Sequence, residues 1–285
     1  MKKALLVICV ICVTFVFMLV SNRNMAFAES NYSSFYHDTY QAGVKSGVID
    51  SNTVPYSKFA EECNEDIAPG YSSYLKNGGN STFQQFAAEN NYDQDPKGAD
   101  PRLSVNTNSM SASNQLMAVS NAKASTDYNM KAGDILICHG TGSEGYFLGH
   151  AAIASSSKYV LEMRGIGYHN EHTTKKDFFE RNTRGDAYVL VYRETKHPNY
   201  ANDAASYAYN DMYKNISIRY EITTNLYHKN PSYCSKYVYL AYYWGANKNM
   251  LMFYPMGDHI VTPFGLIGNF IGSYVPEEIH KITSY

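Results

Sequence analysis

Cys234 stands at the start of a predicted helix, where a thiol can act as a nucleophile. Ser232 can serve as the N-cap of this helix, and Gly245 stands where a C-terminal cap belongs. The positive end of the helix dipole favours the thiolate form of a cysteine in the first turn. A small buried side chain would fit the same position, so the role of Cys234 depends on the partners that the rest of the chain supplies.

His150 and Glu162 are the partners that the sequence offers. A thiolate nucleophile needs a base that takes its proton and a third group that orients the base. Residues 150–154 and 158–163 are strand-like runs separated by three serines, a pattern that predicts a β-hairpin. A three-residue turn would place His150 directly opposite Glu162 on one face. A turn of two or four residues would put Glu162 on the other face, so the triad hypothesis requires an odd turn.

The surrounding elements predict an α+β fold in which an antiparallel sheet packs against helices. Residues 134–138 and 187–192 are further strand-like runs, and residues 201–214 carry apolar side chains at helical spacing. The expected order is a strand, the hairpin, a strand, a helix and then the cysteine helix. The polar run 169–172 predicts a solvated loop.

Three segments resemble the core of the NlpC-type papain-like amidases and peptidases: Ala132 to Leu136, Gly149 to Ile153, and Tyr159 to Glu162. In the ordinary members of that superfamily the cysteine helix precedes these strands, whereas here Tyr233 to Val238 follows them. This order is similar to the circularly permuted branch, which includes the YiiX-like proteins and relatives of the lecithin:retinol acyltransferase type. The resemblance implies a permuted papain-like catalytic domain over residues 128–285.

The resemblance also implies a role for each candidate residue. Cys234 would be the nucleophile, His150 the general base and Glu162 the orienting group, with the backbone N–H of Cys234 as an oxyanion donor. Ile260 to Pro263 resembles the Thr-Pro element that often follows the cysteine helix in that branch. The implied reaction is attack of the thiolate on an amide carbonyl, followed by hydrolysis of the thioester.

The cysteines and the net charge indicate which metal sites, disulfides and nucleic-acid partners are to be expected. Cys138 and His139 could join His150 in a metal site, but the sequence offers no fourth ligand, so no metal or cofactor is expected. Three cysteines lie beyond residue 28, and a disulfide between Cys63 and Cys138 would leave Cys234 free. A net charge of −2 without a basic run argues against nucleic-acid binding. The oligomeric state does not follow from the sequence.

Residues 1–28 have the pattern of a secretory signal peptide. Lys2 and Lys3 form a basic start, residues 4–20 are apolar, and Ala26-Phe27-Ala28 fits a small-x-small cleavage site. An uncleaved membrane anchor is the alternative, because the apolar run approaches the length that spans a bilayer. Cleavage predicts a secreted or cell-wall-associated protein without stable membrane insertion.

Residues 29–127 predict an N-terminal extension and linker rather than a second catalytic unit. Short helices are expected at residues 56–68 and 81–90. The stretch 91–126 is rich in Asn, Ser and Asp and lacks sustained apolar periodicity, which favours a loop or linker. No residue pattern in the extension indicates a function.

Three functions are compatible with this sequence. The leading hypothesis is a secreted cysteine amidase or endopeptidase acting on peptidoglycan or another amide-containing peptide, because secretion fits the common substrates of the resembling family. A second hypothesis keeps the triad but changes the substrate to a lipid or thioester, for acyl hydrolysis or acyl transfer. A third is a catalytically inactive wall-binding module, in which some of the 27 tyrosines supply the contact surface.

Overall fold

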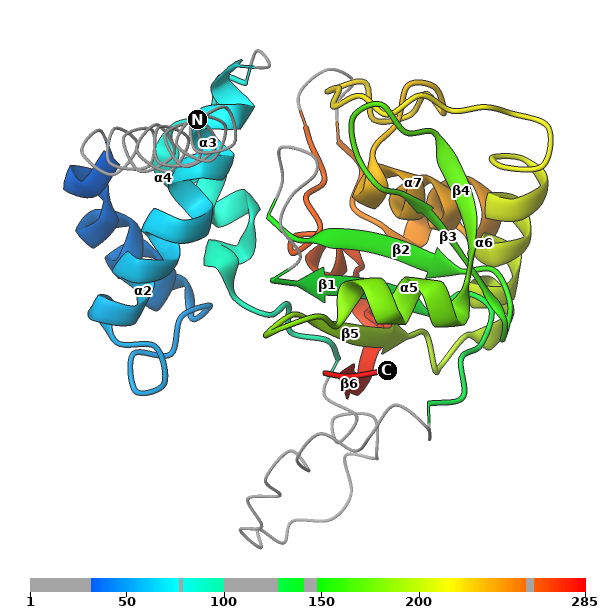
Figure 1. Cartoon of the computed structure of the whole chain (residues 1–285), viewed down its shortest axis with the longest axis horizontal. Helices are drawn as coiled ribbons and strands as arrows, with labels where there is room; N and C mark the ends of the chain where they lie inside the picture. Colours follow the sequence, from blue (N-terminus) through cyan, green and yellow to red (C-terminus); the bar gives the residue numbers. More distant parts are fainter. Residues whose placement is uncertain (1–31, 77–78, 100–127, 141–147, 255–258) are drawn as a thin grey trace, which may run out of the picture. The chain divides into compact units, whose positions relative to one another are not determined.

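Two compact units make up the chain. The computed structural model describes residues 32–76, 79–99, 128–140, 148–254 and 259–285 (Figure 1). By their internal contacts the two units are Met1–Ala88 and Glu89–Tyr285. The predicted signal peptide and most of the predicted linker lie outside the described residues.

The described part of the first unit is helical. Residues 32–46 form its first helix. The elements that follow are α2 (Tyr56–Glu62), η1 (Cys63–Ile67), α3 (Ala68–Lys76) and α4 (Phe83–Glu89). Helices therefore occur in both places where short ones were expected, and the first of them continues through η1 and α3.

Aromatic rings form the core of this helical unit. The ring centroid of Phe83 lies 5.6 Å from those of Tyr32 and Tyr36 and 5.4 Å from that of Tyr71. Phe83 is 3% exposed, and Phe59 is fully buried. Large buried rings in stacked and edge-to-face contact give a small unit most of its apolar stabilisation.

The second unit is built on a six-stranded antiparallel sheet with the strand order β4-β3-β2-β1-β5-β6. The strands are β1 (Ile135–His139), β2 (His150–Ala154), β3 (Tyr159–Met163), β4 (Asn170–Thr174), β5 (Tyr188–Arg193) and β6 (Glu277–Ile282). The central strands are almost wholly buried, as their continuous apolar runs predict.

Helices cover both faces of the sheet (Figure 1). Helix α5 (Lys175–Asn182) packs Phe178 and Phe179 against one face. Figure 1 shows α6 (Pro198–Asn210) and α7 (Cys234–Leu240) on the other face, and α7 runs on into η5 (Ala241–Ala246). The fold class is therefore α+β, with an antiparallel sheet packed against helices that include the cysteine helix, as predicted. No helix within the described ranges is long and apolar enough to cross a bilayer.

Three elements were not expected from the sequence: β4, α5 and β6. The run 169–172, predicted as a solvated loop, contributes three residues to β4. There His172 pairs with Leu161, and Glu171 pairs with Glu162. The prediction of a loop was wrong because β4 lies at the edge of the sheet. Its side chains are polar and bond to neighbouring residues, so the sequence lacks the alternation of polar and apolar residues that marks a strand.

The first residues of the second unit bond to its sheet. The Tyr188 hydroxyl donates to Asp95 Oδ1 at 2.7 Å, and the Tyr192 hydroxyl donates to the Pro96 carbonyl. The N–H of Ala99 donates to the carbonyl of Pro276. The remaining short turns are η2 (Asn91–Asp93), η6 (Lys248–Met250), η7 (Ile267–Asn269) and η8 (Gly272–Tyr274).

Candidate active site

Cys234 is the first residue of α7 and is only 3% exposed. The N-cap of the helix is Tyr233, so the prediction of Ser232 as the N-cap is wrong. The backbone of Ser232 is occupied by bonds to Arg219 and Glu221, which hold it in an extended bridge before the helix begins. Residues 234–243 are all buried, so the helix is covered on every side rather than on one face.

Side-chain hydrogen bonds fix the position of the cysteine helix. The Ser235 hydroxyl donates to the Val261 carbonyl at 2.7 Å, and the Val261 N–H donates to the Tyr233 hydroxyl at 3.1 Å. The buried ammonium of Lys236 donates to the carbonyls of Asn225 and Pro231. The segment that resembles a Thr-Pro element therefore contacts the helix on both sides of Cys234.

His150 begins β2 directly after a residue that only glycine suits. Gly149 has a φ of +69°, and a Cβ atom there would lie 2.6 Å from the carbonyl oxygen of Cys138. This close approach lets β2 start beside β1, where His150 pairs with Cys138. The His150 side chain is 12% exposed, so it lies at the edge of the core.

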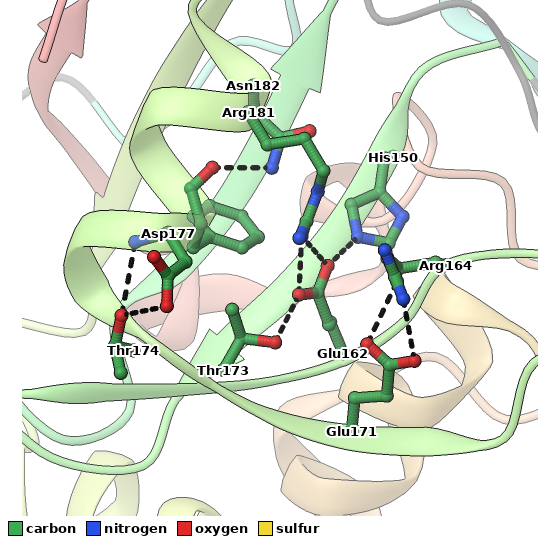
Figure 2. A network of polar contacts seen from close by, with 10 residues as sticks. His150, Glu162, Arg164, Glu171, Thr173, Thr174, Asp177, Arg181 and Asn182 are labelled. Carbon is green, nitrogen blue, oxygen red and sulfur yellow. Dashed lines mark hydrogen bonds and ion pairs between the residues drawn. The ribbon is translucent and has the colours of Figure 1, made fainter.

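The His150 and Glu162 side chains meet, with Nε2 of His150 3.0 Å from Oε2 of Glu162 (Figure 2). The two residues are not directly opposite each other, because Glu162 pairs with Ala152. The predicted three-residue turn is therefore wrong, since Ala154 pairs with Val160 and five residues separate them. Five is also odd, so both side chains still share one face, as the triad hypothesis requires.

Glu162 is held by more partners than sequence reasoning identified. Nη2 of Arg181 lies 2.5 Å from Oε1 and 2.7 Å from Oε2, and the Thr173 hydroxyl donates to Oε1 at 2.7 Å (Figure 2). Arg181 comes from α5 and Thr173 from β4, two of the three elements that the sequence did not predict. Every partner of this fully buried carboxylate is a donor, which is the condition for a buried charge to persist.

These contacts set the charge of the carboxylate and the imidazole. Burial alone would raise the pKa of Glu162, but the hydrogen bond and charge of His150, with the charge of Arg181, lower the pKa to about 2. Burial alone would lower the pKa of His150, but its hydrogen bonds to Cys234 and Glu162 raise the pKa to about 9. At neutral pH Glu162 is a carboxylate and His150 an imidazolium.

The thiol of Cys234 is poised as a thiolate by the same network. Burial raises its pKa, but the hydrogen bond to His150 and the charge of His150 outweigh burial and lower the pKa below the ordinary value. The backbone N–H groups of Ala151 and Ser235 add to this lowering. Because Nε2 of His150 is taken by Glu162, Nδ1 is the ring atom left for Cys234. The arrangement can deliver a nucleophilic sulfur and then a proton to a leaving group.

Cys138 has no comparable activation. Burial raises the pKa of Cys138 far above its ordinary value, and the charge of Glu162 adds to the rise, so this thiol stays neutral. Cys63 is also buried, and no disulfide joins it to Cys138. His139 stacks on Tyr188 at 4.8 Å between ring centroids. Within the described part of the chain, no cluster of three or more His, Cys, Asp or Glu side chains could hold a metal ion.

One sequence signal would have revealed the element that carries Arg181. The Thr174 hydroxyl accepts from the N–H of Asp177, which caps the helix N-terminus, and donates to the Asp177 carboxylate. The pattern Thr-x-x-Asp is visible in the sequence at residues 174–177. Recognising it predicts a helix with Phe178 and Arg181 one turn apart.

Comparison with known proteins adds to this geometry. A family model described as "Lipoprotein N-acylation protein LnsA-like" matches residues 102–281, a range that contains Cys234, His150 and Glu162. An "Uncharacterized 30.3 kDa protein" of Bacillus thuringiensis is 34% identical over 254 residues, which cover 85% of this chain and 87% of the relative. No solved structure gives a significant match.

Proposed function

Because the chain belongs to the LnsA-like family of lipoprotein N-acylation proteins, we propose that it is a cysteine acyltransferase that carries a fatty acyl group on Cys234. The observation that carries the proposal is the buried relay from Glu162 through His150 to a thiol of lowered pKa. A relay of this kind serves acyl chemistry through a covalent thioester.

The first half-reaction loads the enzyme. The Cys234 thiolate attacks the carbonyl carbon of a lipid ester, the C–S bond forms and the ester C–O bond breaks. The imidazolium of His150 gives its proton to the departing alkoxide, and Glu162 holds the ring in place. The backbone N–H of Cys234 is a candidate donor to the oxyanion that develops on the carbonyl.

The second half-reaction releases the acyl group to an amine. The now neutral His150 takes a proton as the amino group of the acceptor attacks the thioester, so the C–N bond forms, the C–S bond breaks and the thiolate and imidazolium return. Water in place of the amine would give hydrolysis. The family description favours an amine acceptor on a lipoprotein.

Two hypotheses from the sequence receive less support. Cleavage of peptidoglycan peptides, the leading expectation, finds no support in the family match, which favours the alternative of acyl transfer. A catalytically inactive binding module has no need for the donor set that holds the buried Glu162 charged beside His150. The secretory signal predicted for residues 1–28 suits an enzyme whose substrates are anchored in a membrane, and we propose an extracytoplasmic location.

The test uses intact mass and product analysis. We expect the chain, mixed with a phospholipid and a diacylated lipopeptide that carries a free amino group, to form an N-acylated lipopeptide. Without acceptor it should gain one acyl mass that hydroxylamine removes. The C234A variant should show neither change, whereas C63A, which alters a buried cysteine of the other unit, should show both. Turnover of muropeptides without acyl transfer would refute the proposal and restore the peptidase hypothesis.

A further inference from the structure

Five aromatic rings form one cluster at the far end of the cysteine helix. Tyr227 is its centre, with ring centroids 5.0 Å from Tyr243, 5.4 Å from Phe253 and 6.4 Å from Trp244. Tyr239 completes the cluster, 5.6 Å from Tyr243. Tyr239 lies on α7, and Tyr243 and Trp244 lie on η5. The cluster is therefore built onto the helix that carries the nucleophile.

The outer members of this aromatic cluster are unusually exposed. Phe253 is 68% exposed and Trp244 is 47% exposed, and both rings contact Tyr227. Met252, next to Phe253, is 38% exposed. Single exposed apolar residues are ordinary, but neighbouring ones that share a common support mark an interaction surface.

The polar atoms of Tyr227, Tyr239 and Trp244 are bonded to the protein itself. The Tyr227 hydroxyl donates to the carbonyl of Tyr254 and accepts from its N–H. The Tyr239 hydroxyl donates to the Met252 carbonyl at 2.8 Å, and Nε1 of Trp244 donates to the Tyr227 carbonyl at 3.4 Å. The exposed ring surfaces can therefore enter an apolar environment without leaving these donors unsatisfied.

The stretch of sequence that contains the aromatic cluster carries positively charged side chains and no negatively charged ones. Residues 222–254 contain no Asp or Glu, although the whole chain has 26 such residues and a net charge of −2. The same stretch carries Lys229, Lys236 and Lys248. Lys236 is buried, whereas Lys248 follows the aromatic cluster on η6 and is exposed. The segments that build this apolar surface carry the exposed Lys248 and no carboxylate of their own, which complements an anionic lipid headgroup layer.

Part of the aromatic cluster lies on the same continuous helical run as the reactive sulfur. Trp244 follows Cys234 by ten residues on the continuous run of α7 and η5, which corresponds to about 15 Å along a helix axis. Aromatic side chains settle at the headgroup level of a bilayer, where an apolar ring and a polar edge are both accommodated. A surface seated there would hold the helix that carries the thiol at the bilayer.

We propose that this aromatic cluster docks on the surface of an anionic lipid bilayer, with Trp244 and Phe253 inserted at the headgroup boundary. The choice of a lipid ester as acyl donor rests on the proposed function, whereas the docking itself requires no catalysis. A protein partner is the competing occupant, and the experiment distinguishes the two because it contains lipid vesicles alone.

Trp244 is the only tryptophan of the chain, so its fluorescence reports on this surface alone. We expect the full-length C234A variant, mixed with vesicles of phosphatidylglycerol and phosphatidylcholine, to show a blue-shifted emission that brominated lipids quench. The quenching should weaken in vesicles of phosphatidylcholine alone and at high salt. Insertion of the apolar residues 4–20 would not mimic this signal, since it would not bring Trp244 into the lipid.

Matched variants complete the test. F253S and K248E should each weaken the quenching several-fold, whereas F35S, which changes a phenylalanine 51% exposed in the other unit, should leave it unchanged. Emission that neither shifts nor is quenched, or F35S lowering the quenching as much as F253S, would overturn the docking proposal. Acyl transfer from a detergent-dispersed lipid would then still report on the proposed function, because that reaction needs no bilayer.

Discussion

The imidazole of His150 reaches Glu162 diagonally across the β2–β3 ladder, with 3.0 Å between Nε2 and Oε2, although Ala152 is the residue directly opposite Glu162. Diagonal neighbours on one face of a sheet are within reach of long side chains. The small side chain of Ala152 leaves room beside the carboxylate. The two side chains share a face whenever the turn has an odd number of residues. The observed turn of five residues therefore serves as well as the predicted turn of three.

Replacing Glu162 by glutamine should uncouple the relay. E162Q keeps a hydrogen-bonding group near His150 but removes the charge, so we expect the pKa of His150 to fall from about 9 towards its ordinary value. Acyl transfer should fall by a factor on the order of 10²–10⁴. Alkylation of Cys234 by iodoacetamide at neutral pH should slow as well. E171Q is the control, because Glu171 pairs with Arg164 instead; equal effects of the two changes would contradict the assignment.

Arg181 should act through Glu162 and affect the acid stability of the fold. The pKa of Glu162 is about 2 in the folded chain, below the ordinary pKa that it has in the unfolded chain. Its contribution to stability is therefore complete above the unfolded pKa and is lost as pH falls through about 2. In R181A the folded pKa should rise, and acid unfolding should begin at a higher pH. The lost bonds should cost about 1.5–3 kcal/mol at neutral pH.

The measurement is acid unfolding followed by circular dichroism, together with the pH dependence of alkylation. R181K retains a charge and one donor, so it should recover part of both effects. The variant R184A removes a neighbouring arginine whose side chain donates to the Glu180 carbonyl instead of Glu162, and it should behave like the wild type. An R181A profile that matches the wild type in both assays would exclude a positioning role.

The rate of acyl transfer should depend on pH through the Cys234–His150 pair. As pH rises through about 9, His150 loses the proton that the leaving group needs, so kcat/KM should decline. As pH falls through the lowered pKa of Cys234, the thiolate becomes protonated, and the rate should decline again. The two limbs belong to the coupled pair rather than to either residue. A rate that keeps rising above pH 9, as for an unassisted thiol, would contradict the ion pair.

Gly149 should tolerate no side chain. In G149A the new Cβ atom would meet the Cys138 carbonyl at 2.6 Å and the Phe264 ring at 2.7 Å, in addition to the left-handed backbone. G167A is the matched control, since Gly167 also has a positive φ but has open space around it. The left-handed conformation alone costs about 1–2 kcal/mol. We expect G149A to lower the free energy of unfolding more than G167A, measured in urea, and to reduce acyl transfer because His150 shifts.

The strands that frame the site were predictable because their signals are strong. The apolar runs of β1, β2, β3 and β5 and the cysteine helix α7 all formed where expected. The hairpin turn is longer than predicted because serine hydroxyls bond its backbone: Ser156 Oγ accepts from the N–H groups of Lys158 and Tyr159. Short polar side chains of this kind extend a turn at the expense of the ladder.

The support of Glu162 was not predictable from apolar periodicity. Thr173 lies on a polar edge strand and Arg181 on a helix of only eight residues, neither of which has a sustained apolar pattern. The capping pattern at residues 174–177 was the available signal. The exposed rings around Tyr227 gave no signal either, because exposure is decided by packing between segments that are distant in the sequence.

The placement of the cysteine helix after the strands has a consequence for how the reactive thiol arises. Ribosomes make a chain from its N-terminus, so His150 and Glu162 exist before Cys234 is added. The lowered pKa of the thiol depends on contacts with His150 and Ala151, which form only when α7 docks on β2. The strands that carry His150 and Glu162 are therefore already synthesised when the thiol emerges, and the thiol stays ordinary until α7 docks on them.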